Sequence, residues 1–401
     1  MKALRQLFIL VIMLLGFLPS MAFGQANLSP VSSEERELIL QEMQSFAEIL
    51  LYYSRLSLDK PADLRACAYE MLRMKPNEKS CRDKHSAWYS KEEAQMLETE
   101  MEGKFGGVGL EVSEQDGKVV VILPIDGAPA YRAGLKSGDV ITKVDGYPVV
   151  NIMDAVKRMR GNPGTETKIT VDRRGKEVTV NVVREVITAH AVSAKTINSS
   201  FGAIGYIKVK TFSEVLPDEL RKEMSAIRAK GIMKVVLDFR NNPGGILWNA
   251  LEILYDFARS GDILMVMRER DRSTVFDTAH VKKELNLNRE SGMFRDMRVV
   301  ILVNKGSASA SEIFAGAMKD WGFPVVGANT FGKGVGQTMI PLSNGSRLRL
   351  TTFEFLVGNS KTKINDIGVI PTHEVVDPKP SSSEALREDK QLEKAVEILS
   401  K

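Results

Sequence analysis

The chain has 401 residues, which is too many for a single hydrophobic core of ordinary size, so we expect two or three domains. Hydrophobic residues make up 43% and charged residues 26%, which excludes disordered, collagen-like, coiled-coil and polytopic membrane proteins. The 55 basic and 51 acidic residues leave a formal charge of only +4, so the composition gives no sign of a nucleic-acid partner.

Residues 1–24 have the features of a signal peptide. Two basic residues precede the uncharged apolar run Leu7–Leu18, and small residues at Ala22 and Gly24 fit a cleavage site. The alternative is an uncleaved anchor helix, but the run is far shorter than the roughly 20 residues that span a bilayer. We therefore expect an exported protein, in the periplasm or on the envelope side of the membrane.

Export affects the interpretation of the two cysteines. In an oxidising compartment Cys67 and Cys81 can form a disulfide, and two free thiols are the alternative. The four histidines are scattered, with no H-E-x-x-H and no C-x-x-C pattern. We expect no metal site and no cofactor.

The pattern of residues 25–103 predicts a helical N-terminal region. Apolar residues recur at intervals of three to four between Leu38 and Leu51, with few β-branched residues among them. Pro61 and Pro76 interrupt the pattern, so several short helices fit better than one long helix.

The sequence pattern of residues 104–187 is typical of a small β-rich domain. The predicted strands are Lys118–Leu123, Val140–Val144, Thr167–Val171 and Lys176–Val182, separated by glycine-containing turns. An amphipathic helix is predicted at Ile152–Arg160.

In residues 188–377 strands and helices alternate, which is typical of an α/β core built in layers. The predicted elements are strand Ile204–Val209, helix Pro217–Lys230, strand Lys234–Phe239, helix Ile246–Arg259, strand Val299–Val303 and helix Ala310–Lys319. Residues 268–297 are predicted to form a long charged loop. Residues 378–401 contain an amphipathic helix, Ser383–Leu399, whose apolar stripe has no obvious core to join and needs a partner surface. The stripe either supports self-association or docks against the α/β core of its own chain. The sequence of the whole chain therefore predicts a multidomain α+β protein.

Three segments of small residues in the α/β part follow predicted strands. The first, Asp238–Gly245, is a Gly-Gly turn that exposes backbone N–H groups at the start of a helix. The second, Asn304–Glu312, contains Ser309, which is either a nucleophile or an ordinary helix cap, since Ser309-x-x-Glu312 is a capping box.

The third segment, Gly327–Gln337, matches the G-x-x-x-x-G-K pattern of a phosphate-binding loop. Gly334 stands where that loop needs Ser or Thr, and a strand-like sequence follows instead of a helix, so we reject this interpretation. Lys333 could instead remove the proton of a serine hydroxyl, if loss of solvation lowers a lysine pKa from about 10.4 toward neutrality. The three segments together predict an amide-hydrolysing site with a serine and lysine dyad.

These residues resemble a known family. Gly306–Ile313 and Thr330–Gly334, with Gln337 beyond them, are similar to the catalytic segments of the carboxyl-terminal processing (tail-specific) serine proteases, and Asp238–Gly245 is similar to their L-D-[LF]-R-x-N-P-G-G stretch. Asp83–Tyr89 resembles the segment that precedes their PDZ domain, with Lys84 in place of the usual Pro.

The resemblance implies a role for each matching residue. Ser309 would be the nucleophile, Lys333 the general base and Gln337 the residue that orients the lysine. The oxyanion hole would be formed by the amide of Ala310 and one from Gly244 or Gly245.

The middle domain also resembles the PDZ domain of that family. Its carboxylate-binding loop would include Gly107, Val108, Gly109 and Leu110. The resemblance therefore implies an exported serine endopeptidase that binds the C-terminal tails of protein substrates and cleaves near them. Self-association and an adaptor or regulatory protein are further partners that this interpretation allows. The alternative is an exported PDZ scaffold without catalytic activity.

Overall fold

The computed structural model of the chain describes residues 33–58, 85–101, 104–115, 117–125, 127–188, 190–200, 202–375 and 389–401. The predicted signal peptide and the predicted Cys67–Cys81 pair lie outside these ranges, so both stay predictions. Within them, no helix combines the length and the apolar character needed to cross a membrane.

The chain divides into two units, residues 1–47 and 48–401. The first contains the start of helix α2 (Ser33–Leu56), and the second contains its end. Within the second unit, Tyr53 of α2 is buried against strands β17 (Val335–Pro341) and β18 (Arg347–Val357).

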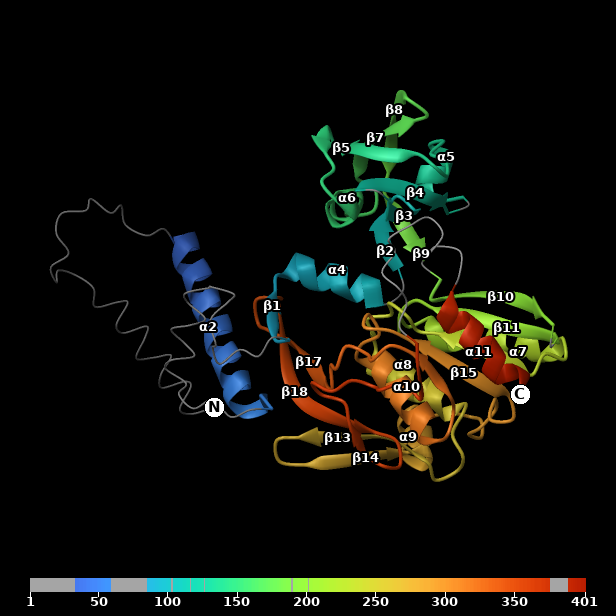
Figure 1. The fold of residues 1–401 in the computed structure, drawn as a ribbon. Helices are drawn as coiled ribbons and strands as arrows, with labels where there is room; N and C mark the ends of the chain where they lie inside the picture. The colour runs from blue at the N-terminus through green and yellow to red at the C-terminus, as the bar shows by residue number, and fades with distance from the viewer. Residues whose placement is uncertain are drawn as a thin grey trace. The chain divides into compact units, whose positions relative to one another are not determined.

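The segment after residue 84 contains both a strand and a helix (Figure 1). Helix α4 (Lys91–Met101) agrees with the predicted helical region, but β1 (Ala87–Tyr89) is a strand that pairs antiparallel with β18, so the helical prediction is wrong there. The adjacent aromatic residues Trp88 and Tyr89 favour a strand, and the edge of β18 supplies the backbone partners.

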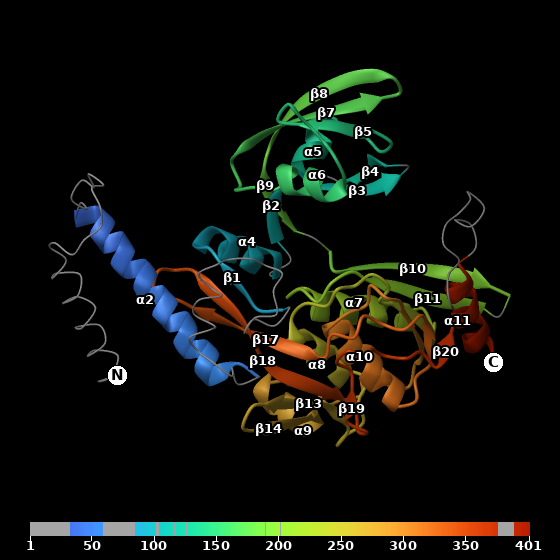
Figure 2. The same ribbon diagram turned by 60° about the vertical axis from the view of Figure 1, so that its left-hand side comes forward.

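The PDZ-like region is a five-stranded sheet of order β3-β4-β5-β7-β8, with the short β6 paired to β5 (Figure 2). Its strands are β3 (Leu110–Gln115), β4 (Lys118–Pro124), β5 (Val140–Val144), β6 (Tyr147–Pro148), β7 (Glu166–Arg173) and β8 (Lys176–Val183), and its helices are α5 (Pro129–Arg132) and α6 (Ile152–Met159). The four strands and the helix predicted here are confirmed. A two-stranded ribbon of β2 (Lys104–Gly107) and β9 (Glu185–Thr188) joins the two ends of this region.

A second sheet forms the centre of the α/β part. Its order is β10-β11-β12-β15-β16-β20, and all neighbours are parallel except β10 and β11. The strands are β10 (Val192–Ser199), β11 (Gly202–Val209), β12 (Lys234–Asp238), β15 (Arg298–Val303), β16 (Val325–Gly327) and β20 (His373–Glu374). The associated helices are α7 (Leu216–Ala229), α8 (Leu247–Tyr255), α10 (Ala310–Asp320) and α11 (Lys390–Ser400).

Both faces of the central strands β12, β15 and β16 are buried, as their near-continuous apolar sequence requires. Alternate residues such as Val235 and Leu237 join one core together with residues of α7, α8 and α10. Their neighbour Val236 points to the other face, where it contributes to a smaller core with residues of α11.

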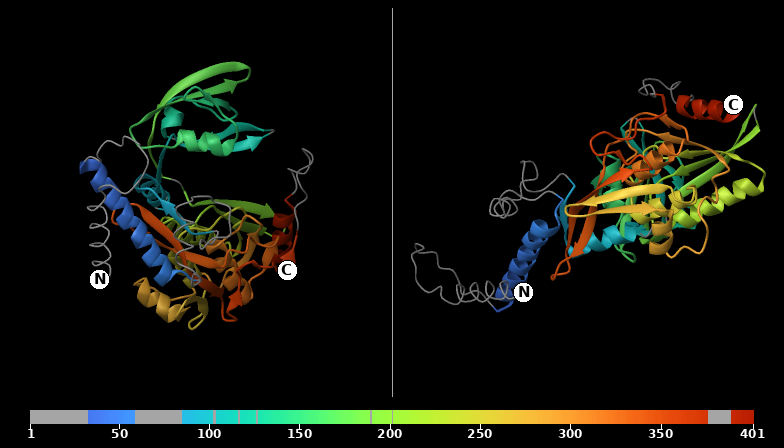
Figure 3. Two further views of the ribbon diagram at one scale, coloured as in Figure 1. Left: turned by 90° about the vertical axis from the view of Figure 1, so that its left-hand side faces the viewer. Right: turned by 90° about the horizontal axis from the view of Figure 1, so that it is seen from below.

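The C-terminal helix therefore has a core to join within its own chain. Helix α11 lies beside the strands of this sheet (Figure 3). Ala395 and Leu399 are 0% and 2% exposed and pack on the sheet, and Leu392 and Val396 are partly buried there. Of the two alternatives for the apolar stripe of this helix, docking against the core of its own chain is the one that the structure shows. Its amphipathic stripe is explained by packing on the sheet face that α7, α8 and α10 leave uncovered.

A third sheet, of order β1-β18-β13-β14 with β17 and β19 (Thr362–Lys363) also paired to β18, completes the α/β part. It includes β13 (Ile263–Glu269) and β14 (Ser273–Asp277), which are followed by α9 (Thr278–Glu284). The prediction of a long loop over residues 268–297 is thus wrong. Phe276 and Val281, 4% and 0% exposed, tie the hairpin and helix to the main core despite the charged residues around them.

Candidate functional site

The three segments singled out in the sequence follow three strands that are neighbours in the sheet. β12, β15 and β16 are adjacent and parallel, and they end at Asp238, Val303 and Gly327. Because the carboxyl ends of parallel strands lie at one edge of a sheet, their loops meet there, where α/β proteins bind ligands. The sheet order therefore brings together loops as far apart in sequence as those that begin at Asp238 and Gly327.

Ser309 lies at the turn between the second loop and helix α10. Its backbone has φ 56° and ψ −115°, a conformation that residues other than glycine rarely adopt. The carbonyl oxygen of Asn242 holds both flanks of this turn, because it accepts hydrogen bonds from the Ala308 N–H (3.0 Å) and the Ser311 hydroxyl (2.9 Å). An ordinary cap needs no such strained backbone, so the geometry favours a functional serine.

Gly244 approaches the Ser309 turn so closely that no side chain fits. A Cβ atom at Gly244, where φ is +100°, would lie 2.9 Å from the Ser309 Cβ and 3.0 Å from the Ala310 nitrogen. The Gly244 N–H donates to the Asn242 side-chain oxygen at 2.9 Å. In the part of the chain that the structure describes, the N–H groups of Gly245 and Ala310 have no hydrogen-bond partner.

Glu312 connects the Ser309 turn to the Lys333 loop. The side chain is fully buried, and its Oε2 accepts hydrogen bonds from the N–H groups of Ser309 (2.8 Å) and Lys333 (2.9 Å). Its Oε1 accepts from the Thr330 hydroxyl (2.5 Å) and the Gly332 N–H (2.6 Å). One carboxylate thus holds the backbones of the two residues predicted to form the dyad.

Gln337 lies on β17, at a register shift that follows Gly336. Its side-chain nitrogen donates to the hydroxyl of Thr351 (3.3 Å) and to the carbonyl oxygen of Val335 (3.5 Å). A Cβ at Gly336 would lie 2.0 Å from the Phe353 ring, so a side chain there would require the ring to move.

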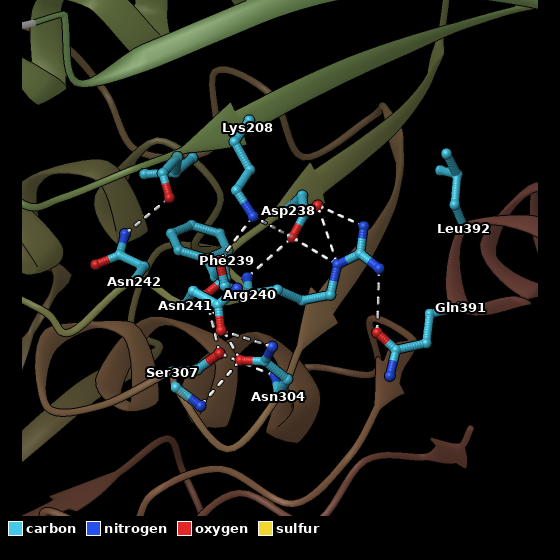
Figure 4. A network of polar contacts seen from close by, with 12 residues as sticks. Lys208, Asp238, Phe239, Arg240, Asn241, Asn242, Asn304, Ser307, Gln391 and Leu392 are labelled. Atoms are coloured by element: carbon cyan, nitrogen blue, oxygen red, sulfur yellow. Dashed lines mark hydrogen bonds and ion pairs between the residues drawn. The ribbon is translucent and has the colours of Figure 1, made fainter. Parts of the chain in front are cut away.

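A cluster of charged residues lies at the base of the first loop (Figure 4). Asp238 is 1% exposed and accepts hydrogen bonds from Tyr206, Lys208 and Arg240. Burial alone would raise the pKa of Asp238, but the hydrogen bonds and charges of its partners hold it below the usual value. Burial lowers the pKa of Lys208.

The predicted carboxylate-binding loop connects β2 to β3. Gly109 has φ +74°, and a Cβ there would lie 2.4 Å from the Ala128 Cβ, which explains the glycine. The carbonyl oxygens of Val108 and Gly109 accept hydrogen bonds from Ala130 and Ile125. Their own N–H groups have no partner among the described residues, as a loop that binds a carboxylate requires. Gly107 ends β2 and Leu110 begins β3.

The local sequence does not indicate the roles of two residues in this arrangement. Glu312 matches only a capping box, and Arg240 lies only in a segment that resembles one of the family. The capping box was the available signal for Glu312, since it places the carboxylate beside the Ser309 N–H. Nothing in the sequence indicates its bonds to the Lys333 loop.

Comparison with known proteins identifies two regions. Residues 203–375 match the family model "Peptidase family S41", and residues 106–183 match that of the PDZ domain. The carboxy-terminal-processing protease of Bartonella bacilliformis is 35% identical over 308 residues, 74% of this chain and 68% of that protein. A probable CtpA-like serine protease of Staphylococcus haemolyticus is 32% identical over 315 residues, 78% of this chain but only 61% of that protein.

Solved structures show the same fold. The photosystem II D1 C-terminal processing protease superposes with a TM-score of 0.54 at 24% identity, covering 90% of this chain and 97% of that one. A putative S41 protease from Bacteroides fragilis gives 0.56 at 17% identity, covering 88% and 97%.

Proposed function

We propose that this chain, which belongs to peptidase family S41, the family of the carboxy-terminal-processing proteases, is an exported serine endopeptidase. It binds the C-terminal tails of protein substrates through its PDZ domain and cleaves peptide bonds near them. The observation that carries this proposal is the buried Glu312, which holds the backbones of Ser309 and Lys333 together. A scaffold without activity would have no use for that connection.

In the proposed reaction Lys333 removes the proton of the Ser309 hydroxyl, whose oxygen attacks the carbonyl carbon of the substrate. The peptide bond breaks as the leaving amine takes the proton from the lysine, which leaves an ester between Ser309 and the substrate. Water then attacks the ester carbon and gives a proton to Lys333, and the bond to the Ser309 oxygen breaks as that oxygen takes the proton back, which releases the carboxylic acid product. We assign to the Gln337 side-chain oxygen the role of orienting the lysine, because the side-chain nitrogen already donates to Thr351.

The oxyanion hole is best assigned to the N–H groups of Gly245 and Ala310. The Gly244 N–H is already engaged with Asn242, which leaves Gly245 as the donor on that loop. The Ala310 N–H begins helix α10, whose dipole favours negative charge at this end.

The PDZ domain supports the substrate class. The free N–H groups of Val108 and Gly109 can bind a terminal carboxylate, and a peptide can pair with the edge strand β3 beside them. Export and location in the periplasm or cell envelope rest on the predicted signal peptide of residues 1–24.

Two variants test the proposal. Ser309→Ala and Lys333→Ala should each reduce cleavage of a tailed protein about 10⁴-fold or more, because each removes half of the dyad. Unfolding curves like those of the unmodified protein would show that the loss is not one of folding. Cleavage that survives in Lys333→Ala would overturn the mechanism. A protein that binds tail peptides but neither cleaves them nor reacts with a serine-directed phosphonate would be the silent scaffold.

A further inference from the structure

The C-terminal helix reaches the base of the candidate site. α11 lies beyond residues 203–375, which match the family model, and packs on β12, β15 and β16, the strands whose loops form the site. The beginning of the helix lies beside the end of β12, where Asp389 caps α11 by accepting the Leu392 N–H at 2.9 Å. This end of α11 also contacts a side chain of the first loop.

That side chain is Arg240, whose guanidinium lies between the carboxylates of Asp238 and Asp389. Figure 4 shows Arg240 with Asp238 and Gln391. Its guanidinium donates to both Asp238 oxygens at 2.7 to 3.1 Å. It also donates to both Asp389 oxygens, at 2.8 and 2.7 Å, and to the Gln391 side-chain oxygen at 3.2 Å. Two of the groups that fix Arg240 therefore come from the C-terminal helix.

The charges of this cluster balance only when α11 is in place. Lys208 and Arg240 carry two positive charges, and Asp238 and Asp389 carry two negative ones. Arg240 is 12% exposed and Asp238 is 1% exposed, whereas Asp389 is 38% exposed, so solvent replaces only part of what a missing Asp389 supplies. Without Asp389, the cluster keeps one excess positive charge, which favours a rearrangement of the Arg240 side chain.

The backbone that follows Arg240 continues into the candidate site. Asn241 has φ +61° and exchanges two hydrogen bonds with the Asn304 side chain, each 2.9 Å long. The next residue, Asn242, holds the Ser309 turn through its carbonyl oxygen and the Gly244 N–H through its side chain. A shift of Arg240 would thus be passed to the loop that carries the candidate oxyanion donor.

We propose that helix α11 is a positioning element of the site: its side chains hold the guanidinium of Arg240 and so fix the backbone of residues 241–245. This inference rests on the proposed function, because it concerns the oxyanion donor assigned to Gly245. Arg240 and Asp389 touch no reacting atom and act through the loop. Displacement of catalytic groups by about 1 Å can cost about a hundredfold in rate, so a small shift of the loop is enough to matter.

The test uses the full chain with Asp389→Ala, assayed on a tailed protein substrate. We expect kcat to fall about tenfold or more while KM changes less than twofold, because an oxyanion donor acts on the transition state. The matched control is Glu397→Ala, which removes a carboxylate of the same helix that pairs with Lys394 and Lys401, and it should leave kcat within twofold. Asp389→Glu keeps the charge and should recover part of the rate.

A second measurement does not need activity. Hydrogen exchange of peptides that cover residues 240–246 should be faster in Asp389→Ala than in Glu397→Ala or the unmodified protein. If Asp389→Ala does not fold, Gln391→Ala removes the weaker contact and should show the same changes at smaller size.

The outcomes separate the two proposals. An active unmodified protein whose kcat and loop exchange are the same in Asp389→Ala refutes the role of α11 alone, as does an equal loss in Glu397→Ala. An unmodified protein that neither cleaves nor reacts with a serine-directed phosphonate refutes the proposed function, and the exchange rates then still decide whether α11 fixes the loop.

Discussion

Replacement of Glu312 by Gln is the sharpest test of how the two loops are held together. The carboxylate accepts four hydrogen bonds, two at each oxygen, and the side chain is fully buried. A glutamine of the same shape keeps one acceptor oxygen and places an NH2 group at the other position. At least one N–H donor must then face another donor.

The less costly orientation places the amide nitrogen near Thr330, whose hydroxyl oxygen can accept a hydrogen bond. The Gly332 N–H then stays unsatisfied, at about 1–3 kcal/mol, and the bonds from Ser309 and Lys333 weaken by about 1 kcal/mol each because the acceptor is no longer charged. The sum is a destabilisation of about 3–5 kcal/mol. The opposite orientation leaves both the Ser309 and the Lys333 N–H without an acceptor and costs more.

Urea unfolding measures this loss, and kcat per phosphonate-titrated active site measures its effect on the proposed serine and lysine dyad. We expect kcat to fall about tenfold to a hundredfold, because the acceptor that Ser309 and Lys333 share loses its charge and the neighbouring Gly332 N–H loses its acceptor. Asp256→Asn is the matched control: this buried carboxylate pairs with Arg221 and Arg289 at the far end of α8, so its loss should lower stability but leave kcat unchanged. A Glu312→Gln protein with normal stability and a kcat within twofold would refute the reasoning.

Two further predictions follow from packing and from charge. Gly336→Ala should lower the free energy of unfolding by about 1–3 kcal/mol, because the new Cβ would lie 2.0 Å from the Phe353 ring, and adding Phe353→Leu should recover part of it; an unchanged urea midpoint in Gly336→Ala would contradict this. Burial acts to raise the pKa of Asp238 and that of Asp389, but the hydrogen bonds and charge of Arg240 hold both pKa values below the usual 3.8. The stability that these two carboxylates contribute is therefore present above about pH 4 and is lost as the pH falls through their folded-state pKa values. The stability difference between the unmodified protein and Asp389→Asn should therefore stay constant from pH 7 to pH 5 and shrink below pH 4, and a difference that grows on acidification would contradict this assignment.

The sequence located the loops of the site but not the contacts that hold them. Asp238–Gly245, Asn304–Glu312 and Gly327–Gln337 were recognisable because small residues follow apolar strands, and a local pattern of this kind survives folding. The bonds from Glu312 to Gly332 and Lys333 depend on the adjacency of β15 and β16, which no local pattern reports.

The same limit explains the errors in the fold. The amphipathic stripe of α11 was visible, but the sheet face that it covers is assembled from four strands distant in sequence. In residues 268–297 the charged side chains dominated the pattern, and the few apolar ones that decide the structure, such as Phe276, are buried by partners elsewhere in the chain.

Backbone hydrogen bonding at the three loops indicates the same candidate oxyanion donors as the resemblance to the protease family does. A buried loop must satisfy its N–H groups, and here nearly every one near Ser309 has a partner: Glu312 accepts those of Ser309, Gly332 and Lys333, and Asn242 accepts that of Gly244. Among the described residues, the N–H groups of Gly245 and Ala310 are left, on either side of the contact between Gly244 and the serine. Two unpaired donors beside a strained serine need an acceptor from outside the chain. The carbonyl oxygen of a substrate peptide, negative in the transition state, is the acceptor that the proposed reaction supplies.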